Sequence, residues 1–154
     1  MSMSHEPTAH EPTTHEPTTG PITAGFNHVA TLTTDLDRFA AWYGDVFGAQ
    51  VTFSMDAEGD HPRMFIVDLG GGSALNVFEV SEDQLIGDRR RIGGRGAIDH
   101  FGIAVTDKAT LEQVRDRLDA AGADLGEIQK LGDEWSLFFR DVDGMELEVC
   151  APAD

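Results

Sequence analysis

The sequence has little of what would place the protein in a membrane or in an oxidising compartment. Its 154 residues include one cysteine, Cys150, so no disulfide can form within the chain and a reducing cytoplasm is the expected location. No apolar run approaches the roughly 20 residues of a membrane-spanning helix. The start of the chain also lacks the apolar core of a signal peptide. We therefore expect no membrane segment.

Basic residues are scarce. The chain has 11 Lys and Arg against 28 Asp and Glu, which gives a formal net charge of -17. Such a surface repels phosphate backbones and anionic lipids, so binding to nucleic acid or to a membrane surface is excluded as the expected function. The same charge favours cations, either metal ions or basic small molecules. The expected partner is a small-molecule substrate.

The N-terminal segment, 1–20, differs from the rest of the chain. Residues 5–19 repeat HEPTA, HEPTT and HEPTT, with proline at every fifth position and almost no apolar side chains. Such a segment cannot form a packed core, so residues 1–20 are predicted to be a disordered tail. Its three histidines can bind metal adventitiously. Residues 21–154 then form a single domain.

The remaining pattern predicts two copies of one β-α-β-β-β unit, module one at 26–80 and module two at 98–150, joined by a charged, glycine-rich connector at 81–97. Apolar residues at helical spacing predict one helix in each module, the first at 35–47 and the second ending at Gly122. Alternation and glycine punctuation predict the strands, which are 26–33, 50–55, 63–69, 73–80, 98–106, 124–131, 135–141 and 145–150.

Equivalent positions in the two modules differ in number by a constant offset of 72. The offset relates His28 to His100, and it also places Asn76 over Glu148. The strand alternation puts these four polar residues on the face of each sheet opposite the apolar, helix-covered face. A lone histidine in a strand is ordinarily a satisfied polar group. Two histidines at equivalent positions, with a carboxylate in the last strand of the second module, instead favour a divalent metal site.

Three segments, FNHVATLTTDLDRFAAWYGDVFGA, DHFGIAV and RDVDGMELEV, resemble in that order the vicinal oxygen chelate superfamily. The superfamily includes glyoxalase I, extradiol dioxygenases, fosfomycin-resistance thiol transferases, methylmalonyl-CoA epimerases and bleomycin-resistance proteins. The resemblance implies an α+β fold in which two tandem βαβββ modules form an open, eight-stranded, barrel-like sheet with the helices outside. It also implies that His28, His100 and Glu148 bind one divalent ion (Fe, Mn, Zn or Ni), which chelates vicinal oxygens of a substrate.

The sequence also departs from particular branches of the superfamily. Asn76 stands where glyoxalase I-like members have a glutamate that is both ligand and base, which argues against glyoxalase I chemistry. Phe138 and Val142 replace the tyrosine and the usual proline of the dioxygenase signature. A dioxygenase-like or a lyase or isomerase reaction stays open. The candidate catalytic residues are Asn76, His61 and Tyr43.

The main rival function is non-catalytic. A bleomycin-resistance-type protein would sequester a cationic drug in the same cleft, which suits the charge of -17 but does not need the His/His/Glu set. A thiol transferase acting on an anionic phosphonate is disfavoured, because the arginine cluster at 89–91 lies in the connector. Unpaired sheet edges predict a homodimer, and the modules can pair either within one chain or between two chains.

Overall fold

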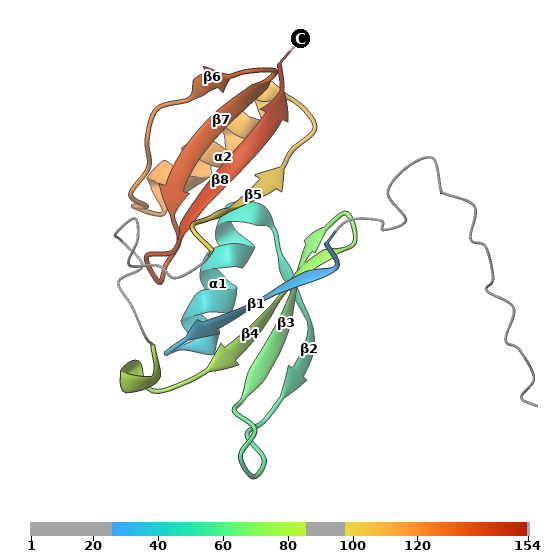
Figure 1. The fold of residues 1–154 in the computed structure, drawn as a ribbon, viewed down its shortest axis with the longest axis vertical. Helices are drawn as coiled ribbons and strands as arrows, with labels where there is room; N and C mark the ends of the chain where they lie inside the picture. The colour runs from blue at the N-terminus through green and yellow to red at the C-terminus, as the bar shows by residue number, and fades with distance from the viewer. Residues whose placement is uncertain (1–25, 86–97, 154) are drawn as a thin grey trace, which may run out of the picture.

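The computed structural model describes residues 26–85 and 98–153 and contains two successive β-α-β-β-β units (Figure 1). The predicted tail and most of the predicted connector lie outside the described residues. The first unit consists of β1 (His28–Thr33), α1 (Leu36–Phe47), β2 (Gln50–Met55), β3 (Met64–Gly70) and β4 (Ser73–Glu79), followed by the short 3-10 helix η1 (Glu82–Gln84). The second consists of β5 (Phe101–Ala104), α2 (Lys108–Ala120), β6 (Gln129–Leu131), β7 (Glu134–Arg140) and β8 (Glu146–Pro152).

Both helices begin at an aspartate that caps the first turn. The side chain of Asp35 accepts a hydrogen bond from the backbone N–H of Arg38, and Asp107 accepts one from Thr110. The N–H and hydroxyl of Thr110 hold the pKa of Asp107 below its usual range. Helix α1 ends at Gly48, whose φ of 70° favours glycine. Within the described residues, neither helix is long and apolar enough to cross a membrane.

The strands form two four-stranded sheets with the same topology. The orders are β1-β4-β3-β2 and β5-β8-β7-β6, with the first two strands of each order parallel and the others antiparallel. In the first sheet Ala30 pairs with Asn76, and in the second Gly102 pairs with Glu148. Each pair is related to the other by the offset of 72, so the register confirms the predicted pair of βαβββ modules.

Two predicted strands are shorter in the structure. The strand predicted from residue 98 is regular only from Phe101. The strand predicted over 124–131 is regular only at its end, as β6. Its first part reaches β7 through separate contacts, because Gly126 donates to the carbonyl of Phe138 and Arg140 donates to that of Asp124.

One hydrophobic core serves both modules. Helix α1 packs on its own sheet and on α2, and Trp42 and Phe47 of α1 contact the ring of Phe139 on β7. The helices therefore lie between the helix-covered faces of the two sheets, with α1 near the middle of the molecule (Figure 1). The opposite faces, which carry Asn76 and Glu148, point away from this core. We call these the open faces of modules one and two.

Candidate metal centre

The open face of module two brings His100 and Glu148 together. His100 Nε2 lies 3.5 Å from Glu148 Oε2, and the Glu148 side chain is only 15% exposed. Two ligands of one tetrahedral ion, each about 2.1 Å from it, lie about 3.4 Å from one another. The observed separation fits that donor set. The ring of Phe138, which pairs with Glu148 in register, contacts His100 edge-on at 5.3 Å and adds an apolar wall.

Both predicted histidine ligands are held by the residue that precedes them. Asn27 Oδ1 lies 2.9 Å from His28 Nδ1, and Asp99 Oδ2 lies 2.8 Å from His100 Nδ1. The amide oxygen is only an acceptor and the carboxylate accepts when ionised, so each Nδ1 donates its proton and each Nε2 keeps its lone pair for a metal. The sequence reasoning missed this pair, although the offset of 72 also relates Asn27 to Asp99.

His28 does not join the other two predicted ligands within one chain. Across residues 26–85 and 98–153, no group of three or more His, Cys, Asp or Glu side chains is close enough to hold an ion. His28 instead lines a cavity of about 500 Å³ between β1 and β5, whose other wall includes Gly102 and Ala104. The free edges of the two sheets face this cavity.

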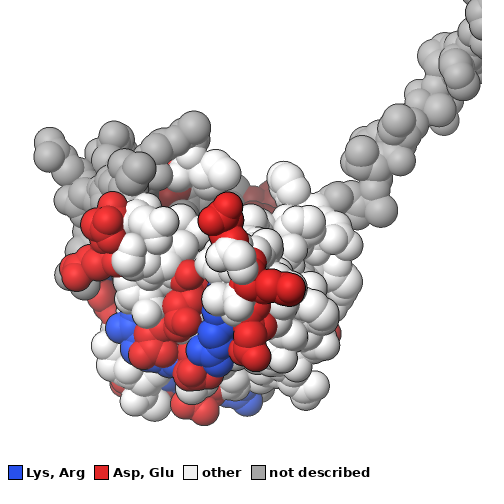
Figure 2. Space-filling view, turned by 90° about the horizontal axis from the view of Figure 1, so that it is seen from below, with Lys and Arg blue, Asp and Glu red and all other residues white. Residues whose placement is uncertain are grey.

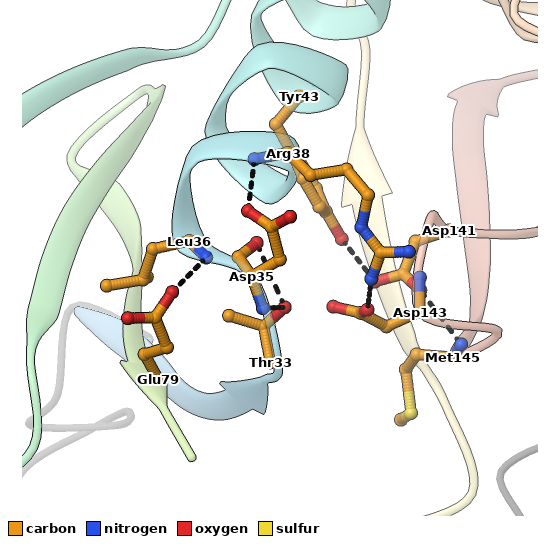
Figure 3. Close-up of polar contacts among 9 residues, drawn as sticks. All are labelled: Thr33, Asp35, Leu36, Arg38, Tyr43, Glu79, Asp141, Asp143 and Met145. Atoms are coloured by element: carbon orange, nitrogen blue, oxygen red, sulfur yellow. Dashed lines mark hydrogen bonds and ion pairs between the residues drawn. The ribbon is translucent and has the colours of Figure 1, made fainter. Parts of the chain in front are cut away.

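Asn76 occupies the open face of module one, as its alternation predicts. It is half-buried between Ala30 of β1 and Ile66 of β3, which pair with it in register. Its neighbour Glu79 points to the helix side, where its carboxylate accepts a hydrogen bond from Leu36 N–H at the start of α1 (Figure 3). The charged residue of this strand is therefore structural, and the amide faces the candidate site.

Cys150 also lies on the open face of module two. Its Sγ is packed against Gly102, where an added Cβ would come within 3.3 Å of the sulfur. Burial and the neighbouring Glu148 and Glu134 raise the pKa of the thiol to about 11. The thiol therefore stays protonated at neutral pH and fills space beside Glu148.

The two remaining candidate catalytic residues lie in different environments. His61 is exposed on the β2–β3 hairpin, and its ring contacts Phe78 on the open face of module one. Tyr43 is 1% exposed in helix α1, where its ring stacks on Phe39. The structure therefore places Tyr43 in the core, on the opposite side of the sheet from Asn76, and we do not include it in the site.

The hydroxyl of Tyr43 instead joins the two modules. It donates to Asp141 Oδ2 at 2.9 Å, across the junction between α1 and the β7–β8 turn (Figure 3). Asp141 Oδ1 accepts from the backbone N–H groups of Asp143 and Met145, and Arg38 of α1 forms an ion pair with Asp143. Burial raises the pKa of Asp141, against the effect of these donors.

Acidic side chains outnumber basic ones on the face shown in Figure 2, and the basic ones lie among them. Arg63 contacts both Asp37 and Glu79 on the helix side of module one. On the open face of module two, Arg140 pairs with Glu146 at 2.9 Å. The described strands of module one contain no lysine or arginine.

Comparison with known proteins places the chain in a family. The family model of the Glyoxalase/Bleomycin resistance protein/Dioxygenase superfamily matches residues 25–149. The chain belongs to this superfamily. A search of curated proteins found no match.

Superfamily members of known structure share the fold over most of this chain. A glyoxylase/bleomycin resistance protein/dioxygenase domain from Frankia sp. EAN1pec is 27% identical, with a TM-score of 0.69, over 84% of this chain and 98% of its own. The fosfomycin resistance protein FosX from Listeria monocytogenes, complexed with Mn(II) and 1S,2S-dihydroxypropylphosphonic acid, is 16% identical, with a TM-score of 0.61, over 83% and 90%. TnmS3, an antibiotic binding protein from Streptomyces sp. CB03234, is 14% identical, with a TM-score of 0.63, over 87% and 100%.

Proposed function

We propose that this superfamily member is a divalent-metal-dependent enzyme that acts on a small molecule through vicinal oxygens. The observation that carries the proposal is the arrangement of His100 and Glu148, whose ligand atoms are 3.5 Å apart while Asp99 holds the far side of the imidazole. A solved relative of the same fold, FosX, contains Mn(II). The single cysteine favours a reducing cytoplasm as the location.

We propose that a second copy of the chain completes the site. Within one chain the open faces of the two modules point away from the shared core, and among the described residues His28 lies apart from His100 and Glu148. The free edges of β1 and β5 flank the cavity, and unpaired strand edges favour association with another strand. A symmetric homodimer would place module one of each subunit opposite module two of the other.

In this site the protein groups bind and orient the substrate. A bound divalent ion would supply Lewis-acid stabilisation of negative charge on the two substrate oxygens. His28, His100 and Glu148 would hold the ion and leave positions for those oxygens. Asn76 adds a neutral amide that can donate a hydrogen bond to a substrate oxygen. Because it adds neither charge nor a base, the proposed reaction is dioxygenase-like or a lyase or isomerase reaction, and is not that of glyoxalase I.

Mixing two defective variants tests the composite site. We expect His28→Ala and His100→Ala homodimers each to bind metal weakly. When the two are unfolded together and refolded, about half of the dimers should be mixed, and each mixed dimer should have one intact site. The metal content of the refolded mixture should therefore recover to about a quarter of the wild-type value. Metal analysis of the mixture measures this recovery.

The control is the same mixing with His100→Ala and Glu148→Gln, which both damage module two and should restore nothing. Recovery in neither mixture, with wild-type protein that binds metal, would contradict the composite site and place all three ligands in one chain. A wild-type protein without metal affinity would contradict the metal-dependent function itself.

A non-catalytic binding protein is the second candidate. The net charge of -17 and the absence of lysine and arginine from the described strands of module one favour a cationic ligand, and TnmS3, an antibiotic binding protein, has the same fold. Metal-free protein that binds a cationic glycopeptide such as bleomycin, with unchanged affinity in the His100→Ala variant, would support this candidate over the enzyme.

A further inference from the structure

The open face of module one continues beyond Asn76 towards an aromatic and imidazole pair. Phe78 follows Asn76 by two positions on β4, so both side chains lie on the same face, about 6.6 Å apart along the strand. Leu32 and Met64 pair with Phe78 in register and flank it with apolar side chains. The ring of His61 packs against Phe78 with the ring centroids 5.8 Å apart.

The hairpin that carries His61 is fixed by its own hydrogen bonds. Glu58 and His61 exchange both backbone N–H to C=O bonds at 3.0 Å, and Gly59 supplies the left-handed φ of 59° that the tight turn needs. His61 Nδ1 lies 2.7 Å from the carbonyl oxygen of Pro62. A carbonyl only accepts, so Nδ1 carries the proton, and Nε2 of the neutral ring is an acceptor for a ligand.

The charges around this pair are negative. The hairpin has three exposed acids, Asp56, Glu58 and Asp60. The neighbouring cation, Arg63, is directed to the helix side, where it contacts Asp37 and Glu79 and lies 4.9 Å from the Phe65 ring centroid. The electrostatic field at Phe78 therefore favours a positively charged or N–H-bearing group and disfavours an anion.

We propose that His61 and Phe78 form a substrate subsite for an apolar body that ends in a cationic nitrogen. The body packs on Phe78, and the terminal N–H donates to His61 Nε2 within the field of the hairpin acids. This inference rests on the proposed function, because the chelate of vicinal oxygens near Asn76 positions the body along the strand. The substrate class is a small vicinal diol or related chelating compound with an apolar spacer and an amine.

Three catechol probes with the same chelating end and different tails test the subsite. Dopamine ends in an ammonium group, 4-propylcatechol is its apolar isostere, and 3-(3,4-dihydroxyphenyl)propionate ends in a carboxylate. Binding of each to the Mn(II)-loaded protein is measured by anaerobic calorimetry. We expect dopamine to bind about ten-fold more tightly than 4-propylcatechol, as for one charge-assisted hydrogen bond, and the carboxylate to bind most weakly.

Two variants of His61 separate the acceptor from the ring. His61→Phe keeps an aromatic ring on Phe78 and should abolish the preference for dopamine without weakening 4-propylcatechol. His61→Gln keeps a side-chain acceptor and should retain part of the preference. Phe78→Leu should weaken all three probes by a similar factor, because it reduces contact with the body only.

The outcomes distinguish the subsite from the function on which it rests. If the three probes bind equally and His61→Phe changes none of them, the subsite is wrong while metal chelation stands. If the carboxylate binds best, the charge argument is overturned. If no probe binds the Mn(II)-loaded protein, chelation of vicinal oxygens fails, and the subsite fails with it.

Discussion

Replacing His100 by alanine should weaken divalent metal binding by about 100-fold or more, because it removes an imidazole ligand and leaves Glu148 without its partner at 3.5 Å. Glu148→Gln should have a similar effect, because the neutral amide is a far weaker ligand than the carboxylate. The measurement is metal content and affinity by mass spectrometry and competitive titration. Residues 1–20 are deleted from all variants so that the tail histidines do not contribute.

Matched controls separate ligand loss from general charge loss. Glu112→Gln removes a carboxylate from the exposed side of α2, where it pairs with Lys108, and should leave the metal affinity unchanged. Asp99→Asn should lower the affinity by about 10-fold, because it weakens the group that orients His100. A His100→Ala protein that keeps wild-type affinity would show that the ion binds elsewhere.

Replacing Asp141 by alanine should lower the free energy of unfolding by about 3 kcal/mol, since each partly buried donor left without an acceptor costs about 1–3 kcal/mol, part of which water recovers. The change removes the acceptor for three donors at the junction of the modules, namely the Tyr43 hydroxyl and the backbone N–H groups of Asp143 and Met145. Urea unfolding measures the loss, with the slope of the transition as a check for two-state behaviour.

Asp141→Asn is the matched control. Its amide oxygen can still accept from both backbone N–H groups, and the Tyr43 hydroxyl can rotate to accept from the amide nitrogen. We therefore expect a loss below about 1 kcal/mol near neutral pH. Equal losses in the alanine and asparagine variants would show that the donors at this junction are satisfied by other groups.

The same pair of proteins carries a pH dependence with a defined sign. Burial raises the pKa of Asp141, so the folded state holds this proton more tightly than the unfolded chain does. The contribution of Asp141 to stability is therefore full below its ordinary pKa and is lost as the pH rises through the raised value. The stability of the wild type relative to Asp141→Asn should fall between about pH 4 and about pH 7. A constant difference would contradict the raised pKa.

Much of the fold could be predicted from the sequence, because it is written in local patterns. The caps at Asp35 and Gly48 fix the bounds of α1, and the apolar spacing of each helix fixes its buried face. The offset of 72 predicted that Asn76 and Glu148 take equivalent places, which the register of the two sheets confirms. These features depend on neighbours in sequence or on repetition.

The rest depends on contacts that local patterns do not encode. Helix periodicity marks Tyr43 as a position on the apolar face of α1, but it does not show that Asp141, far along the chain in the second module, accepts its hydroxyl. The sequence likewise shows that each module has one apolar face, and not that the two faces share one core. The same limit applies to Asn27 and Asp99, whose contacts with the histidines depend on side-chain rotamers.

The shared core has a consequence for how the protein folds. Phe139 of module two packs against Trp42 and Phe47 of module one, so neither module alone covers its own apolar surface. Cutting the chain in the connector would expose that surface on both fragments. The two repeats therefore form one cooperative folding unit, although each looks like a complete domain in sequence, and neither can be lost or exchanged without its partner.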